Sequence, residues 1–170
     1  KPLASKDDSA LKKLINFYKK TYAIIGSIIL IVGIAIIPFI SEIITDAPNI
    51  KENIYIIYLL FLSDTAISYF FSYKTSIISA DQKKYIVVMY TYMFKICQII
   101  LQLVLLYFTK QYFLYLILQV ITTLLTNAYL SQKAEKMYPF LSDLSGNYLE
   151  KSERKKIFDN VKALFVYKLG

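Results

Sequence analysis

Two ionisable side chains lie inside long apolar segments, and they are the strongest candidates for chemistry in this sequence. Asp64 is the one charged residue of 53–73, and Lys95 is the one charged residue of 85–109. A charge at the bilayer centre costs about 2.5–3.5 kcal/mol on insertion scales, so we expect both to face other helices or a hydrated cavity. In an antiparallel hairpin both would lie about 14–15 Å from the same face, close enough to pair. The sequence leaves open whether they form an ion pair.

The composition predicts a membrane protein. Of the 170 residues, 56% are hydrophobic, and they occur in long blocks. The net charge of +8 is carried mainly between these blocks, and no nucleic-acid recognition motif accompanies it, so we expect a membrane surface and no nucleic acid as its partner. Without His, and with Cys97 as the single cysteine, we expect no enzyme, no metal and no cofactor.

The fold class predicted is all-α, a multi-pass bundle in the lipid bilayer. Four segments are each long and apolar enough to cross a bilayer core, which takes about 20 helical residues. They are residues 21–41, 53–73, 85–109 and 111–132. In the first of them, the spacing of Ala23, Gly26, Leu30 and Gly33 lets another helix approach closely.

Amphipathic segments flank the four spans. Residues 1–20 are predicted to form a cytoplasmic helix over 5–20 with a basic face. Residues 133–170 are predicted to be a cytoplasmic connector with a second helix on the membrane surface. Its apolar stripe is Ile157, Phe158, Val161, Leu164 and Phe165.

Polar side chains recur at helical spacing on one face of each of the last three spans. Such stripes indicate a hydrated cavity for a polar substrate, with Lys95 available as a point charge for a phosphate. The stripes comprise Asp64, Ser68, Ser72 and Thr75; Thr91, Lys95, Gln98 and Gln102; and Tyr115, Gln119, Thr122, Thr123 and Thr126. The candidate substrate-binding residues are Asp64, Ser68, Lys95, Gln98, Gln102, Gln119 and Thr123.

A structural interpretation of the same residues stays open. The charges would neutralise each other, and the Gln, Ser and Thr side chains would join helices by hydrogen bonds worth about 0.6 kcal/mol each. We favour the cavity because the polar positions outnumber what helix pairing needs.

The distribution of Lys and Arg predicts the orientation in the cell membrane. The segments 1–20, 74–84 and 133–170 hold six, three and eight of them, whereas the two other loops hold one each, Lys51 and Lys110. By the positive-inside rule, both ends of the chain are cytoplasmic.

Several blocks resemble bacterial polysaccharide or oligosaccharide flippases of the multidrug/oligosaccharidyl-lipid/polysaccharide exporter superfamily. The resemblance extends over nearly the whole chain, although the blocks are no catalytic signature. The blocks are Lys1-Pro2-Leu3-Ala4 with Lys6-Asp7, Ser68-Tyr69-Phe70-Phe71-Ser72-Tyr73-Lys74, Ala80-Asp81-Gln82, Tyr138-Pro139-Phe140-Leu141 and Asn160-Val161-Lys162-Ala163-Leu164-Phe165.

The resemblance implies a longer protein of about twelve to fourteen spans in two lobes that works by alternating access. These four spans would be the third to sixth of the first lobe, and Leu149–Val166 would belong to the connection between lobes. The implied substrate is a polyprenyl-diphosphate-linked glycan, carried from the cytoplasmic to the outer leaflet. The opening spans and the second lobe are absent from this sequence, which we interpret as an internal fragment.

Three other classes remain. A drug antiporter of the same superfamily would use Asp64 as the carboxylate for a coupling cation. A membrane-embedded transferase would need clustered His, Asp or Cys at a membrane face, and the sequence offers none. A subunit that only packs helices would tolerate alanine at Gln98, Gln102 and Gln119 together.

Overall fold

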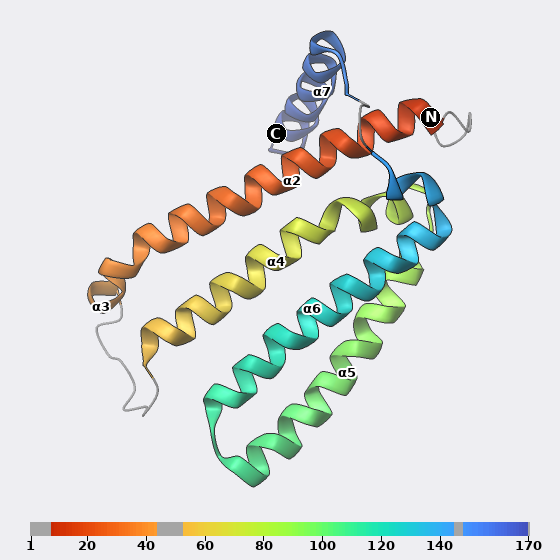
Figure 1. Ribbon diagram of the computed structural model, residues 1–170. Helices are drawn as coiled ribbons and strands as arrows, with labels where there is room; N and C mark the ends of the chain where they lie inside the picture. Colours follow the sequence, from red (N-terminus) through yellow and green to blue (C-terminus); the bar gives the residue numbers. More distant parts are fainter. Residues whose placement is uncertain (1–7, 44–52, 145–147, 170) are drawn as a thin grey trace.

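The computed structural model describes residues 8–43, 53–144 and 148–169, and within these ranges every regular element is helical (Figure 1). The elements are α2 (Asp8–Ile36), η1 (Ile37–Phe39), α3 (Ile40–Ile43), α4 (Ile54–Ala80), α5 (Lys84–Thr109), α6 (Tyr112–Met137), η2 (Pro139–Ser142) and α7 (Lys151–Leu169). The all-α prediction is confirmed.

Four of these helices, α2, α4, α5 and α6, are long and apolar enough to cross a membrane. They contain 26 to 29 residues, which at 1.5 Å per residue makes each about 39–44 Å long and longer than a hydrocarbon core of about 30 Å. The chain is therefore a multi-pass membrane protein whose helices extend beyond the core.

The four long helices lie side by side in the order α2, α4, α6, α5 (Figure 1). Helix α4 packs against α2 on one side and α6 on the other, and α6 packs in turn against α5. Although α4 and α5 are joined by a tight turn, α6 lies between them along most of their length. The sequence places both charges at one depth of a two-helix hairpin and leaves their pairing open, and this order puts α6 against both helices.

Helix α2 merges two segments that the sequence analysis had separated. The expected amphipathic helix over 5–20 and the span 21–41 form one continuous α-helix, Asp8–Ile36. No Gly or Pro occurs near Lys20, so nothing in the sequence breaks the helix there. The first break comes at Pro38, where the chain continues as the 3-10 turn η1.

The turn between α4 and α5 is shorter than expected. The predicted loop 74–84 is helical to Ala80, and only Asp81–Lys83 turn the chain, with Gln82 at φ 57°. The expected two-residue turn at Lys110 and Gln111 is confirmed, and Lys110 adopts a left-handed conformation with φ 52°. Most of the acidic loop 41–53 and the block 1–7 lie outside the described residues.

Two glycines allow α2 and α4 to approach closely, as their spacing predicted. A Cβ placed on Gly33 would lie 2.4 Å from Leu62 Cδ1, and one on Gly26 would lie 3.4 Å from Phe70 Cζ. The Tyr58 hydroxyl also donates a hydrogen bond of 2.9 Å to the Gly33 carbonyl oxygen. Small residues at such positions permit backbone contact between membrane helices.

A Gly33→Leu substitution is expected to lower the free energy of unfolding by about 1–3 kcal/mol, because the new side chain overlaps Leu62 and forces the helices apart. Reversible unfolding in mixed micelles measures the change. Gly26→Ala is the matched control, since its new Cβ makes only a contact of 3.4 Å, and it should cost clearly less. Equal costs for both variants would show that the α2–α4 distance is not set at Gly33.

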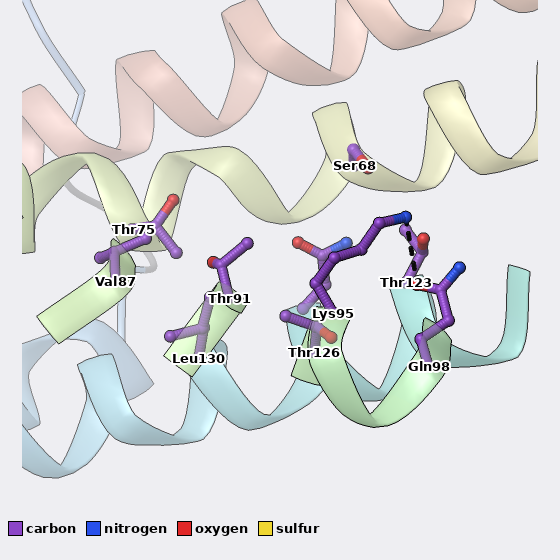
Figure 2. A pocket seen from close by; sticks show the side chains of 10 residues that line it. Ser68, Thr75, Val87, Thr91, Lys95, Gln98, Thr123, Thr126 and Leu130 are labelled. Atoms are coloured by element: carbon purple, nitrogen blue, oxygen red, sulfur yellow. Dashed lines mark hydrogen bonds between the residues drawn. The ribbon is translucent and has the colours of Figure 1, made fainter. Parts of the chain in front are cut away.

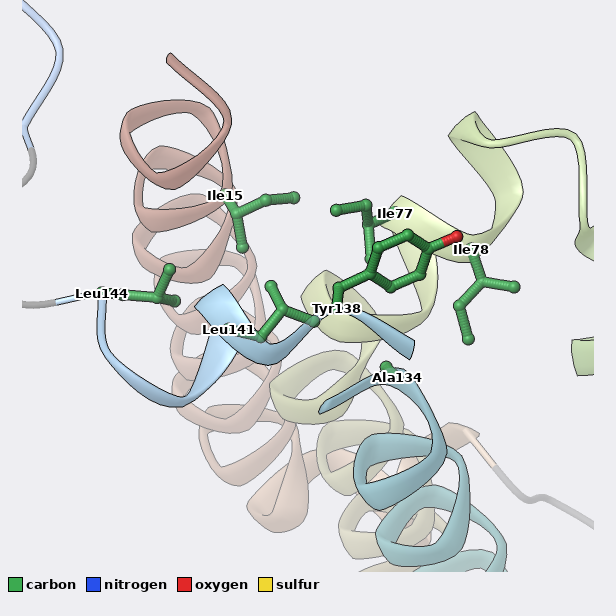
Figure 3. Packing of buried hydrophobic residues seen from close by; sticks show 7 residues of the cluster. All are labelled: Ile15, Ile77, Ile78, Ala134, Tyr138, Leu141 and Leu144. Atoms are coloured by element: carbon green, nitrogen blue, oxygen red, sulfur yellow. The ribbon is translucent and has the colours of Figure 1, made fainter. Parts of the chain in front are cut away.

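The buried apolar core lies at one end of the bundle, beyond the middle of the spans (Figure 3). There η2 and its flanks fill the space between α2, α4 and α6. The cluster consists of Ile15, Ile77, Ile78, Ala134, Tyr138, Leu141 and Leu144. Asn16 Nδ2 donates to the Leu144 carbonyl oxygen at 3.2 Å and adds a polar link. We call this end of the bundle the basic end, because the start of α2, the 81–83 turn and the end of α6 bring their lysines together there.

Polar contacts at the basic end tie the α4–α5 turn to the end of α6. The Tyr138 hydroxyl donates to Asp81 Oδ2 at 2.6 Å, and Lys83 Nζ lies 2.7 Å from the same oxygen. The hydrogen bonds from Lys83 and Tyr138 lower the pKa of Asp81, whereas burial and the neighbouring carboxylate raise the pKa of Tyr138. Nearby on the same two helices, Lys74 Nζ of α4 lies 2.5 Å from Glu135 Oε1 of α6.

Because the pKa of Asp81 is lowered below its ordinary 3.8, its contribution to stability is present above pH 3.8 and is lost as the pH falls through the lowered value. A Tyr138→Phe substitution removes one of the two hydrogen bonds, so the pKa of Asp81 should rise toward 3.8. Carboxyl chemical shifts recorded during an NMR titration measure this. An unchanged titration in Tyr138→Phe would mean that the phenol does not stabilise the carboxylate.

Candidate functional site

A polar cavity of about 250 Å³ lies between α4, α5 and α6 (Figure 2). Hydroxyl and amide side chains from all three helices form most of its wall, and among the lining residues Lys95 is the one that carries a formal charge. The wall comprises Ser68 and Thr75 of α4, Val87, Thr91, Lys95 and Gln98 of α5, and Thr123, Thr126, Asn127 and Leu130 of α6.

Lys95 and Gln98 form a polar pair on the α5 wall. Lys95 Nζ donates to Gln98 Oε1 at 3.4 Å, a long bond, and the lysine side chain is exposed to the cavity (Figure 2). Gln98 is 3% exposed, and its Nε2 is buried without a hydrogen-bond partner. An unpartnered buried amide is costly, so this wall offers a donor that a ligand or water would satisfy.

Three other predicted site residues lie outside the cavity and join helices instead. Gln119 Nε2 of α6 donates to Asp64 Oδ2 of α4 at 3.1 Å. Gln102 Nε2 of α5 donates to the Tyr115 carbonyl oxygen of α6 at 3.0 Å. These bonds draw α4 and α5 onto α6 at neighbouring depths.

Asp64 and Lys95 do not form an ion pair in this structure. The carboxylate faces α6 and the ammonium bonds within α5, so each polar group has a different partner. The physical reason is that α4 packs more closely on α6 than on α5 and presents Asp64 to Gln119 of α6. The second carboxylate oxygen, Asp64 Oδ1, is buried and has no partner.

The cavity is asymmetric along the helix axes. Its wall runs from Ser68, Gln98 and Thr123 near the middle of the helices toward the basic end, reached at Thr75, Val87 and Leu130. The Asp64–Gln119 and Gln102–Tyr115 hydrogen bonds lie on the opposite side of that midpoint. The three polar stripes therefore divide into a hollow half that lines the cavity toward the basic end and a bonded half whose side chains form hydrogen bonds between helices.

Sequence reasoning proposed four of the lining residues as binding residues, namely Ser68, Lys95, Gln98 and Thr123. It placed Thr75, Thr91 and Thr126 on the stripes without assigning them a role, and it missed Asn127. Asn127 follows Thr123 by four residues, so extending the α6 stripe by one helical step would have found it.

The side chains of this wall are suited to binding a polar ligand. Hydroxyls and amides donate and accept hydrogen bonds, and one ammonium adds a positive charge. Among the described residues, no group of three or more His, Cys, Asp or Glu side chains is placed to hold a metal ion.

Comparison with known proteins gives this chain no relative. No protein-family model matches it, no curated protein matches it, and no solved structure matches it.

Proposed function

We propose that this chain is part of a membrane transporter that flips lipid-linked oligosaccharide or polysaccharide precursors across the cytoplasmic membrane by alternating access. Both ends of the chain would be cytoplasmic, and further spans of the same longer polypeptide would complete the pathway. The observation that carries the proposal is the asymmetric polar cavity, which extends toward the basic end, with interhelical hydrogen bonds beyond the middle of the helices.

The lining chemistry fits a sugar joined to a phosphate. Sugar hydroxyls both donate and accept hydrogen bonds, as do the threonine and amide side chains of the wall. Lys95 supplies the one formal charge of this wall, and its sign is that required for a diphosphate. An apolar polyprenyl chain would stay in the lipid beside α5, whose outer face exposes Met89, Ile96, Ile100 and Leu103.

A cation-coupled drug antiporter of the same superfamily is the second candidate, because Asp64 Oδ1 is buried and unpartnered. A proton or sodium ion would satisfy that oxygen. A non-transporting structural subunit accounts for the Asp64–Gln119 and Gln102–Tyr115 bonds, but it gives no reason for a polar cavity beside them.

Reconstitution of the complete polypeptide that contains this chain separates these candidates. Vesicles that carry a polyprenyl-diphosphate oligosaccharide in the inner leaflet are probed with a membrane-impermeant glycosidase added outside. The flippase proposal predicts that protein accelerates the exposure of the sugar. Proton-driven accumulation of a cationic dye without sugar exposure would contradict the flippase proposal and support the antiporter. The absence of both activities would support the structural subunit.

A further inference from the structure

A second cavity, of about 150 Å³, lies at the basic end between α2 and the segment that leads into α7. Its wall includes Phe17, Lys20 and Ile24 of α2, together with Tyr148 and Arg154 (Figure 1 shows α7 beside this part of α2). No side chain of the first cavity takes part in it. It is therefore a separate site.

Two cations lie on this wall, and their polar contacts hold them in place. Lys20 Nζ lies 4.2 Å from the centroid of the Tyr148 ring, and Arg154 Nε donates to the Leu149 carbonyl oxygen at 3.0 Å. Among the described residues, neither cation has a carboxylate as an ion-pair partner. The nearby Glu153 carboxylate accepts from the Glu150 backbone N–H at 2.9 Å, at the start of α7. The cavity thus has an uncompensated positive wall.

The depth of this wall matches the edge of a lipid bilayer. Lys20 is the last charged residue of α2, and the next twenty-one residues, 21–41, carry no charge. That length spans a hydrocarbon core of about 30 Å, which places the Lys20 ammonium among the lipid headgroups. Tyr148, with its ring and hydroxyl, suits the same interface.

An exposed apolar stripe continues from the cavity into the membrane. Ile24 of the cavity wall is 60% exposed, and Ile28 and Ile31 follow on the same helix at 53% and 68% exposed. Their spacings of four and three residues put them on one helical face. A molecule with an anionic head in the cavity would therefore lay an acyl chain along this stripe.

We propose that the cavity binds the phosphodiester headgroup of an anionic phospholipid, with one acyl chain along Ile24, Ile28 and Ile31. Lys20 and Arg154 contact the phosphate, and Arg154 offers the guanidinium geometry that suits phosphate oxygens. The bound lipid would fasten α7 to α2 at the membrane surface. This inference stands apart from the transport proposal, because it uses different residues and no substrate.

Native mass spectrometry of the detergent-solubilised chain, titrated with phosphatidylglycerol or phosphatidylcholine, tests the site. The Lys20→Gln/Arg154→Gln variant should bind phosphatidylglycerol about ten- to thirty-fold more weakly than the unaltered chain, with phosphatidylcholine unaffected. The matched control is Lys84→Gln/Lys155→Gln, which removes the same charge from residues outside the cavity and should bind normally. The charge-conserving Lys20→Arg variant should also bind normally, provided that it and the others keep their helical circular dichroism.

Equal weakening in both double variants would show a diffuse charge effect and overturn the site. Loss of binding in Lys20→Arg would also contradict an electrostatic headgroup contact. Glycerol phosphate, added as a soluble competitor at the lipid concentration, should leave the complex intact. Displacement by this competitor would mean that the isoleucine stripe contributes nothing, and that the site takes a free phosphate ester and not a lipid.

Discussion

A Lys95→Ala substitution in the complete transporter is expected to lower the rate of substrate flipping by about ten- to a hundred-fold. A hydrogen bond to a charged group contributes about 1.5–3 kcal/mol, and each 1.4 kcal/mol is a factor of about ten in affinity. Among the described residues that line the cavity, no other carries a formal charge to replace it. The glycosidase-exposure assay in proteoliposomes measures the rate.

Two variants separate loss of the charge from loss of the fold. Lys95→Arg keeps the charge and should retain much of the activity, whereas Lys84→Ala removes a lysine from the exposed basic end outside the cavity and should have little effect. Normal flipping by a well-expressed Lys95→Ala protein would remove Lys95 from the substrate pathway.

The coupling free energy between Asp64 and Gln119, measured on unfolding, should exceed that between Asp64 and Lys95. The first pair shares a hydrogen bond of 3.1 Å, and the second pair shares none. Alanine double-mutant cycles on the free energy of unfolding should give about 1–2 kcal/mol for the first pair and less than about 0.5 kcal/mol for the second.

The charge-swapped double variant Asp64→Lys/Lys95→Asp provides an independent check. Because no ion pair is present, the exchange should not restore the stability that either single change removes. Restoration would show that the two charges meet in a state other than this one. The cycle with Gln102→Ala in place of Lys95→Ala serves as a control, since Gln102 bonds to α6 independently of Asp64.

The four spans were predictable from the sequence because long uncharged segments are unambiguous in a membrane. The Gly26 and Gly33 contacts were also predictable, since their spacing already placed both on one face. The predicted positions of the helix ends were less accurate. The charge of Lys74 suggested that a loop begins there. Lys74 lies instead within α4, and its side chain forms an ion pair with Glu135 of α6.

The lateral order of the helices could not be read from the sequence. Stripe spacing shows which side chains share a face, but not which neighbour that face meets. For this reason the sequence alone does not show that Asp64 accepts a hydrogen bond from Gln119 of α6. The same limit concealed the division of each stripe into a hollow half and a bonded half, and it left the Tyr138–Asp81 contact unforeseen.

Because the cavity extends toward the basic end and the hydrogen bonds of Asp64 and Gln102 lie beyond it, we expect water to reach the cavity from the basic end alone. Cysteine accessibility measures this. Cys97 is the single cysteine, so Cys97→Ala gives a background free of thiols. Single cysteines are introduced into this background one at a time. Thr91→Cys and Thr126→Cys lie in the cavity wall, and Ile96→Cys and Leu125→Cys lie on exposed apolar faces. A membrane-impermeant methanethiosulfonate reagent, which reacts with the hydrated thiolate, is then applied to either side.

A Lys155→Cys variant on α7 reports which side of the vesicle carries the basic end. We expect the two cavity cysteines to react from that side at least about ten-fold faster than the membrane-facing pair, and not to react from the other side. Labelling of the cavity cysteines no faster than the membrane-facing pair, or equally from both sides, would contradict it.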